Sequence, residues 1–275
     1  MQGNKLFSRN AFFSTLIIAQ AALTLSATVP APESAPAAKS APAAISAPSA
    51  MSASAASSAS AAASAPAERP FTPLSDAEKT ALLARLKQES GQVKGLRSNF
   101  VQTSATVMLV KPEVTRGVLS FAKPMAFRYE YDNGNVFTLK EGSFTYYLPA
   151  QKQAGKLDLR RYNRMLGKFA DPLGIIDHIG TDYTLIEAGR QGETYRLKLA
   201  PGGSQKRGPL AGVTLELAGT PLAITAISVA MNNGDSLGLA FSGTELNPAL
   251  PDSVFSVKIP AGVTLKESLP SNMNF

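Results

Sequence analysis

The chain of 275 residues contains no cysteine and only one histidine, His178. Without cysteine it has no disulfide and no thiol nucleophile, and a single histidine leaves too few ligands for a zinc site. We therefore expect no metal and no cofactor, and a domain that is held together by its hydrophobic core alone. Bacterial lipoproteins are lipidated on a cysteine, so we do not expect this chain to be a lipoprotein itself.

A strong excess of one charge is also missing. From residue 70 onward, 23 lysines and arginines stand against 18 aspartates and glutamates, and the resulting net charge of +5 is mild. The chain carries no recognised nucleic-acid-binding motif either. Nucleic acid is therefore not an expected partner.

The N-terminus is typical of an export signal. Lys5 and Arg9 precede a mostly apolar stretch over residues 11–25, which is shorter than the roughly 20 apolar residues of a membrane-spanning helix. This pattern predicts a cleaved signal peptide over residues 1–27 and a periplasmic location. An uncleaved N-terminal anchor is the alternative.

Residues 28–69 consist mostly of alanine, serine and proline. So few large apolar side chains cannot bury enough surface to offset the entropy lost on ordering, and we predict a disordered linker. The remaining residues, 70–275, suit a single folded domain.

The domain begins with a helix signal and continues with strand signals. Ser75 followed by Glu78 is a capping box, which predicts a helix that runs to about Ser90 and ends at Gly91. Short runs of β-branched and aromatic residues follow, separated by turn dipeptides such as Asn133-Gly134. These runs predict strands over residues 114–121, 126–131, 136–139, 143–148, 183–187, 194–199, 213–217, 225–231, 237–241 and 254–259.

A second helical pattern interrupts the strands over residues 162–179, and Pro172 is expected to break it in two. So many antiparallel strands in one domain must curl or close. We predict a mainly β (α+β) fold: an incomplete, strongly curved antiparallel β-barrel of about ten or eleven strands, with helices forming a lid over an apolar pocket. An ordinary filled sandwich or barrel fits the same pattern.

One serine matches a hydrolase motif. Ser236 lies in Gly234-Asp235-Ser236-Leu237-Gly238, which fits the G-x-S-x-G string of a nucleophile elbow. An elbow requires a strand, a sharp turn and a helix, whereas residues 232–235 lie between two predicted strands and indicate a hairpin turn. His178 also precedes the serine, the reverse of the order in that family. A serine hydrolase at Ser236 is therefore a remote alternative, and we expect no enzyme.

Several segments agree in order with a known family. They are Phe100-Val101-Gln102, residues 117–130 (GVLSFAKPMAFRYE), residues 141–149 (EGSFTYYLP), Asp171-Pro172-Leu173, and a closing set of Asn247-Pro248, Phe255, Pro260 and Gly262-Val263. Over roughly residues 79–267 the chain resembles the outer-membrane lipoprotein carrier protein LolA. The closing set resembles the family's last strand.

The resemblance implies a function and a set of partners. It implies a monomeric periplasmic carrier that shields the acyl chains of lipoproteins and ferries them from the inner to the outer membrane. Its partners would be acylated lipoproteins, an inner-membrane lipoprotein-releasing transporter and an outer-membrane acceptor lipoprotein. A carrier of the same fold for another lipid, or for an amphiphilic biosynthetic product, is the alternative.

The resemblance also implies a binding surface. Phe127 and Tyr129 share one face of their strand while Arg128 and Glu130 share the other, so the first face is expected to line the cavity. The expected cargo-binding residues are Phe100, Phe121, Lys123, Phe127, Tyr129, Phe144, Tyr146, Leu173 and Ile176. Lys123 stands where the family commonly has arginine. Lysine lacks the planar guanidinium fork, so we expect weaker or differently arranged control of the lid.

Overall fold

The computed structural model describes residues 71–268 except 108–110, 161–173, 204–205 and 207. The predicted signal peptide and linker lie outside these residues, as does most of the helix predicted over 162–179. The statements that follow concern the described residues.

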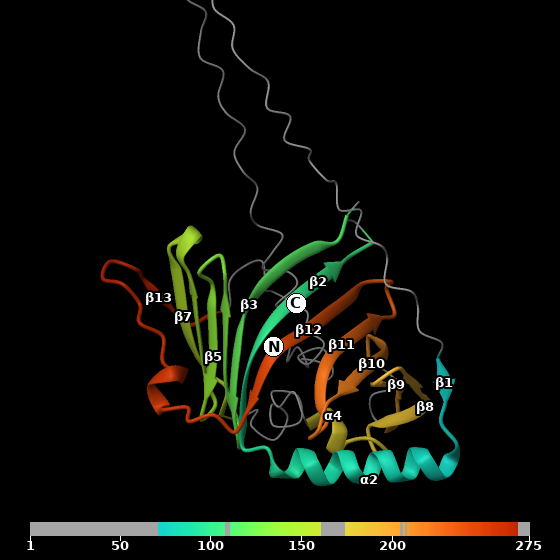
Figure 1. Cartoon of the computed structure of the whole chain (residues 1–275). Helices are drawn as coiled ribbons and strands as arrows, with labels where there is room; N and C mark the ends of the chain where they lie inside the picture. The colour runs from blue at the N-terminus through green and yellow to red at the C-terminus, as the bar shows by residue number, and fades with distance from the viewer. Residues whose placement is uncertain (1–70, 108–110, 161–173, 204–205, 207, 269–275) are drawn as a thin grey trace, which may run out of the picture. The chain divides into compact units, whose positions relative to one another are not determined.

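The domain is built on one sheet of thirteen strands that curves strongly and stays open (Figure 1). The order across the sheet is β1-β8-β9-β10-β11-β12-β2-β3-β4-β5-β6-β7-β13, and all neighbours are antiparallel except β7 and β13. The strands are β1 (Thr72–Pro73), β2 (Gly95–Ala105), β3 (Glu113–Ala122), β4 (Ala126–Tyr131), β5 (Val136–Lys140), β6 (Ser143–Leu148), β7 (Gln153–Asp158), β8 (Tyr183–Gln191), β9 (Thr194–Pro201), β10 (Leu210–Ala218), β11 (Ala223–Met231), β12 (Ser236–Leu246) and β13 (Leu265–Lys266). The predicted incomplete barrel is confirmed. It has eleven longer strands and two of only two residues.

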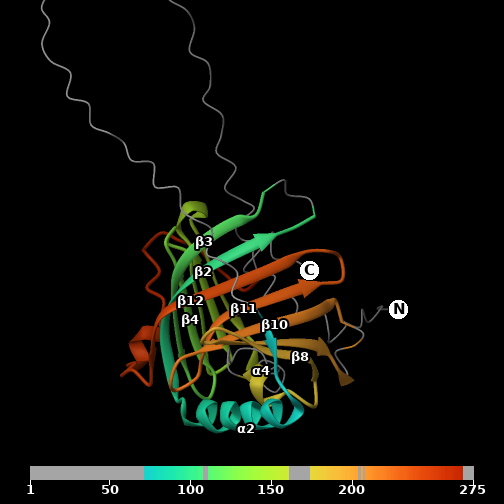
Figure 2. The same ribbon diagram turned by 45° about the vertical axis from the view of Figure 1, so that its right-hand side comes forward.

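Helix α2 (Asp76–Gln92) lies across one end of the curved sheet, and the short helix α4 (Gly174–Asp177) lies beside it (Figures 1 and 2). The predicted capping box is present, because Ser75 Oγ accepts from the Glu78 N–H and the Glu78 carboxylate accepts from the Ser75 N–H. Leu82, Leu86 and Ser90 follow at four-residue spacing and form the buried side of the helix.

The predicted end of this helix at Gly91 is wrong by one residue. Helix α2 continues to Gln92, and Val93 is its C-cap. Asn247 fixes this corner, since its side-chain oxygen accepts from the Lys94 N–H at 2.6 Å and its amide nitrogen donates to the Gln92 carbonyl at 3.2 Å. The helix therefore ends where a distant side chain satisfies the backbone, and no glycine cap is needed.

The strand predicted over 254–259 is also wrong. Residues Asp252–Phe255 form a 3₁₀ helix, η4, which contacts β4 and β5. Arg128, on the outward side of β4, donates to the carbonyls of Val254 at 3.5 Å and Ser256 at 3.0 Å. The segment is thus fastened to the outside of the sheet by a side chain, with Phe255 buried against it.

Strands β2 and β7 were not predicted from the sequence. The inward positions of β2 include Ser98, Gln102 and Ser104, so the run lacks the apolar alternation by which a half-buried strand is recognised. Strand β7 has Gly155 at its centre. A Cβ atom at this position would clash with the Tyr146 ring, so only glycine fits there.

Candidate functional site

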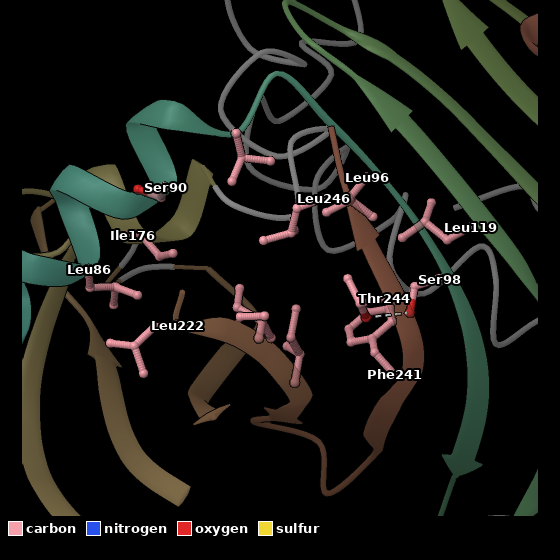
Figure 3. A pocket seen from close by; sticks show the side chains of 14 residues that line it. Leu86, Ser90, Leu96, Ser98, Leu119, Ile176, Leu222, Phe241, Thr244 and Leu246 are labelled. Atoms are coloured by element: carbon pink, nitrogen blue, oxygen red, sulfur yellow. Dashed lines mark hydrogen bonds between the residues drawn. The ribbon is translucent and has the colours of Figure 1, made fainter. Parts of the chain in front are cut away.

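An apolar pocket lies where α2 meets the sheet (Figure 3). It encloses about 510 Å³ of space, including the open space at its mouth. Its walls come from four parts of the fold. They are Leu86, Ser90 and Val93 at the end of α2, Leu96, Ser98 and Leu119 on β2 and β3, Ile176 on α4, and Leu222, Ala223, Ile224, Ile227, Phe241, Thr244 and Leu246 on or beside β11 and β12.

The pocket wall contains three hydroxyl groups, and each is already paired. Ser98 Oγ lies 2.8 Å from Thr244 Oγ1 (Figure 3). It also lies 3.2 Å from the Ser242 carbonyl oxygen. Ser90 Oγ donates to the Lys87 carbonyl at 3.2 Å. Because these groups bond to protein, the wall presents an almost wholly apolar surface. Such a wall suits a hydrocarbon chain.

The end of α2 is tied to the sheet on both sides of the pocket. Lys123 Nζ, in the turn between β3 and β4, donates to the Ser90 carbonyl at 3.2 Å. On the other side, the Leu222 N–H donates to the Glu89 carboxylate at 2.5 Å, and Arg85 donates to the same carboxylate at 2.8 Å. These two donors, with Arg85 the larger influence, hold the pKa of Glu89 below its usual value. The pocket thus has a hydrogen-bonded helix as its cover.

Only some of the predicted cargo-binding residues lie at this pocket. Ile176 lines it, and Lys123 lies at its rim through its bond to Ser90. Leu173 lies outside the described residues. The other six are aromatic residues of the core between β2 and β6, and they do not line the pocket: Phe100, Phe121, Phe127, Tyr129, Phe144 and Tyr146.

These aromatic rings contact one another. The Phe100 ring packs edge-on against Tyr129 and Tyr131, with centroids 5.5 and 5.2 Å apart. Phe127 packs edge-on against Tyr129 at 5.7 Å, and Phe144 lies 6.4 Å from Tyr146. Burial, more than any other influence, raises the pKa of Tyr131 well above its usual value.

The pocket residues that sequence reasoning missed are mostly aliphatic. Leu86 lies on the buried side of the helix that the capping box predicts. Ile224 and Ile227 lie on β11, where nothing in the local pattern separates a pocket wall from a filled core. Leu222 directly precedes β11, and only the folded structure shows that it lines the pocket.

The hairpin turn predicted at the hydrolase-like motif is confirmed. Residues 232–235 join the antiparallel strands β11 and β12, and Gly234 has φ +90°. The Met231 N–H donates to the Asp235 carbonyl at 2.9 Å, which closes the turn. Ser236 is the exposed first residue of β12, so it does not sit on a strand-to-helix elbow.

Comparison with known proteins identifies the family. The sequence profile of "Outer membrane lipoprotein carrier protein LolA" matches residues 91–258, which is more than half of the chain. The chain belongs to the LolA family. Among curated protein sequences, none matches it.

Several solved structures are similar to this LolA-family chain. An uncharacterized conserved protein from Thermus thermophilus is 12% identical, with 69% of this chain and 98% of that one covered and a TM-score of 0.44. A LolA superfamily protein from Nitrosomonas europaea is 12% identical, covers 65% and 97%, and has a TM-score of 0.36. Lipoprotein LppX of Mycobacterium tuberculosis is 9% identical, covers 64% and 99%, and has a TM-score of 0.37.

Across the part of the chain that the structure describes, no helix combines the length and the apolar character that crossing a bilayer requires.

Proposed function

We propose that this LolA-family chain is a periplasmic carrier that shields the acyl chains of lipoproteins and ferries them from the inner to the outer membrane. It would receive them from an inner-membrane lipoprotein-releasing transporter and deliver them to an outer-membrane acceptor lipoprotein. The role consists of binding and release, and it assigns no catalytic residue.

The observation that carries this proposal is the apolar pocket under α2, in which every hydroxyl of the wall is already bonded to protein. Burying a methylene contributes about 0.8 kcal/mol, so an acyl chain of about 14 methylenes costs on the order of 11 kcal/mol to expose to water. At about 25 cal/mol per Å², covering it takes on the order of 450 Å² of apolar protein surface. Soluble proteins rarely leave that much exposed, and a covered cavity solves the problem.

The hydrogen bonds at the end of α2 support release as well as binding. The cover is held by Lys123 and Glu89 through a few bonds to backbone groups, and only Leu82, Leu86 and Ser90 of the helix are buried. A helix held in this way can move without unfolding the sheet. Cargo would enter and leave by displacement of this cover.

The proposal can be tested by filling the pocket. Ile227 on β11 lines the pocket and is half-buried, whereas Ile186 on β8 is 60% exposed and lies outside the pocket lining. Ile227→Trp is expected to weaken the binding of a synthetic triacylated lipopeptide by at least about tenfold, since the ring occupies the space of the acyl chain. Ile186→Trp is the matched control and is expected to bind like the parent protein.

Two results would contradict the proposal. If the parent protein binds neither the lipopeptide nor a phospholipid, or if the two tryptophan variants bind the lipopeptide equally well, the pocket is not an acyl site. If the parent binds a phospholipid and not the lipopeptide, it is a carrier of another lipid. Mass spectrometry of what co-purifies from the periplasm would then identify that lipid.

A further inference from the structure

A group of polar side chains lies on the same inward face of β2 as the pocket, but farther along the strand. Ser98 lines the pocket, and Gln102 and Ser104 follow on the same face because side chains alternate along a strand. Gln102 is 0% exposed and Ser104 is 2% exposed. Gln102 lies about 13 Å along the strand from Ser98.

Thr115 on β3 completes the group. It pairs with Gln102 in the β2–β3 register, on the same face of β3 as the pocket residue Leu119. Its hydroxyl oxygen is fully buried and has no hydrogen-bond partner in the described structure. We refer to Gln102, Ser104 and Thr115 as the polar patch.

The hydrogen bonds at the polar patch form a chain that begins at a donor outside it, Tyr131, and ends at the Ser104 hydroxyl. Tyr131 Oη donates to Gln102 Oε1 at 2.9 Å, and Gln102 Nε2 donates to Ser104 Oγ at 3.4 Å. Ser104 Oγ therefore acts as an acceptor and keeps its own proton to donate. Within the described residues, neither the Ser104 proton nor the Thr115 hydroxyl has an acceptor. Two hydroxyl donors thus face the concave side of the sheet from adjacent strands.

The surroundings of the polar patch are apolar. Leu237 and Leu239 of β12 pair with Ser104 and Gln102 in register, and both are buried. Phe100 precedes the patch on the same face of β2. A buried hydroxyl without a partner is destabilising, and a ligand that offers an acceptor to Thr115 would remove that cost.

We propose that the Thr115 and Ser104 hydroxyls donate to the carbonyl oxygen of an ester or amide that links an acyl chain to its carrier molecule. This inference rests on the proposed acyl-binding function and adds a polar contact to it. A carbonyl oxygen fits because it is a neutral acceptor with two lone pairs. An anionic group does not fit, since Glu113, which pairs with Ser104 in register, would repel it. The hydrocarbon would extend from the polar patch toward the pocket under α2.

The test measures the preference for a carbonyl with two ligands of matched chain length. The full chain is loaded with Nile red, and the dye is displaced either by methyl hexadecanoate or by hexadecyl methyl ether, which lacks the carbonyl oxygen. The parent protein is expected to prefer the ester. In Thr115→Val, which keeps the shape of the side chain, this preference is expected to fall by about three- to tenfold. Ser104→Ala is a second variant with the same expected direction.

Thr103→Val is the matched control, because Thr103 lies on the opposite face of β2 and is half-buried. It is expected to keep the ester preference of the parent. Thermal unfolding of the empty Thr115→Val protein should show no loss of stability, since the hydroxyl that is removed has no partner there.

Each remaining outcome decides the question. Equal loss of ester and ether binding in Thr115→Val, or an unchanged preference, overturns the inference and leaves acyl binding intact. A parent protein that binds both ligands equally also overturns it. A parent that binds neither ligand contradicts the proposed function itself.

Discussion

The two halves of the sheet build their inner faces from different residues. From β2 to β7 the buried face is largely aromatic, and several of its rings pack edge-on against one another. From β8 to β12 it is largely aliphatic: Leu197, Leu199, Val213, Leu215, Leu217, Ile224, Val229, Leu237 and Leu239. We refer to these as the aromatic half and the aliphatic half. Most of the sheet residues that line the pocket come from the aliphatic half.

The difference shows that large apolar side chains and a binding cavity need not coincide. Aromatic rings cover much area each and meet in preferred edge-on arrangements, so they complete a core by contacting one another. The aliphatic half meets α2 through smaller side chains such as Ala223, and space remains beneath the helix. Cargo binding is therefore expected to depend on the aliphatic half, and stability to depend more on the aromatic half.

The largest expected effect is on stability, and it is tested by comparing two phenylalanines that pair across the boundary between the halves. Phe100 on β2 is 1% exposed, and its register partner Phe241 on β12 is half-buried and lines the pocket. Phe100→Ala is expected to lower the free energy of unfolding by about 3–5 kcal/mol and to change acyl-probe affinity less than Phe241→Ala does. Phe241→Ala is expected to cost less stability and to change that affinity. Urea unfolding and probe titration measure the two quantities, and the reverse pattern would break the comparison.

More of the fold than of the site could be predicted from the sequence. Turn dipeptides and alternating residues locate most strands, because both signals are local. Strand β2 was not predicted, because its inward face carries Gln102 and two serines. The strand predicted over residues 254–259 is absent, and Arg128, which is distant in sequence, donates to a backbone carbonyl of this segment. Of the predicted cargo-binding residues, Ile176 lines the pocket, whereas the aromatic residues do not, and Ile224 and Ile227 were not predicted. Which apolar residues border empty space is set by packing between distant elements, and a local pattern does not carry that information.

A smaller effect concerns the tie between α2 and the aromatic half. Lys123→Met removes the bond from Nζ to the Ser90 carbonyl and a positive charge near the C-terminal end of the helix. We expect a loss of about 0.3–1 kcal/mol in unfolding free energy, together with faster release of a bound acyl probe, measured by stopped-flow fluorescence. Lys123→Arg is the control and should release the probe at least as slowly as the parent. Unchanged release in Lys123→Met would show that this tie does not control the cover.

The smallest expected effect is on the pH dependence of stability, and it concerns the hydrogen bond between Glu89 of α2 and the aliphatic half. Arg85 and the Leu222 N–H hold the pKa of Glu89 below its ordinary 4.5. A lowered native pKa contributes stability that is present in full above the ordinary value and is lost as the pH falls through the native one. Glu89→Gln keeps the shape and cannot titrate. Its thermal midpoint should therefore fall less than that of the parent between neutral pH and about pH 3. Parallel curves for the two proteins would rule out a contribution from Glu89.

An open sheet of this length has two edges at which another chain could add a strand. Both edges are occupied by strands of only two residues, β1 beside β8 and β13 beside β7. Pro73 in β1 has no N–H to offer a further strand, and β13 pairs with β7 only at Ala154 and Gly155. Such short edge strands give an incoming chain little backbone on which to extend pairing. Two edges built in this way disfavour strand pairing between copies of the sheet.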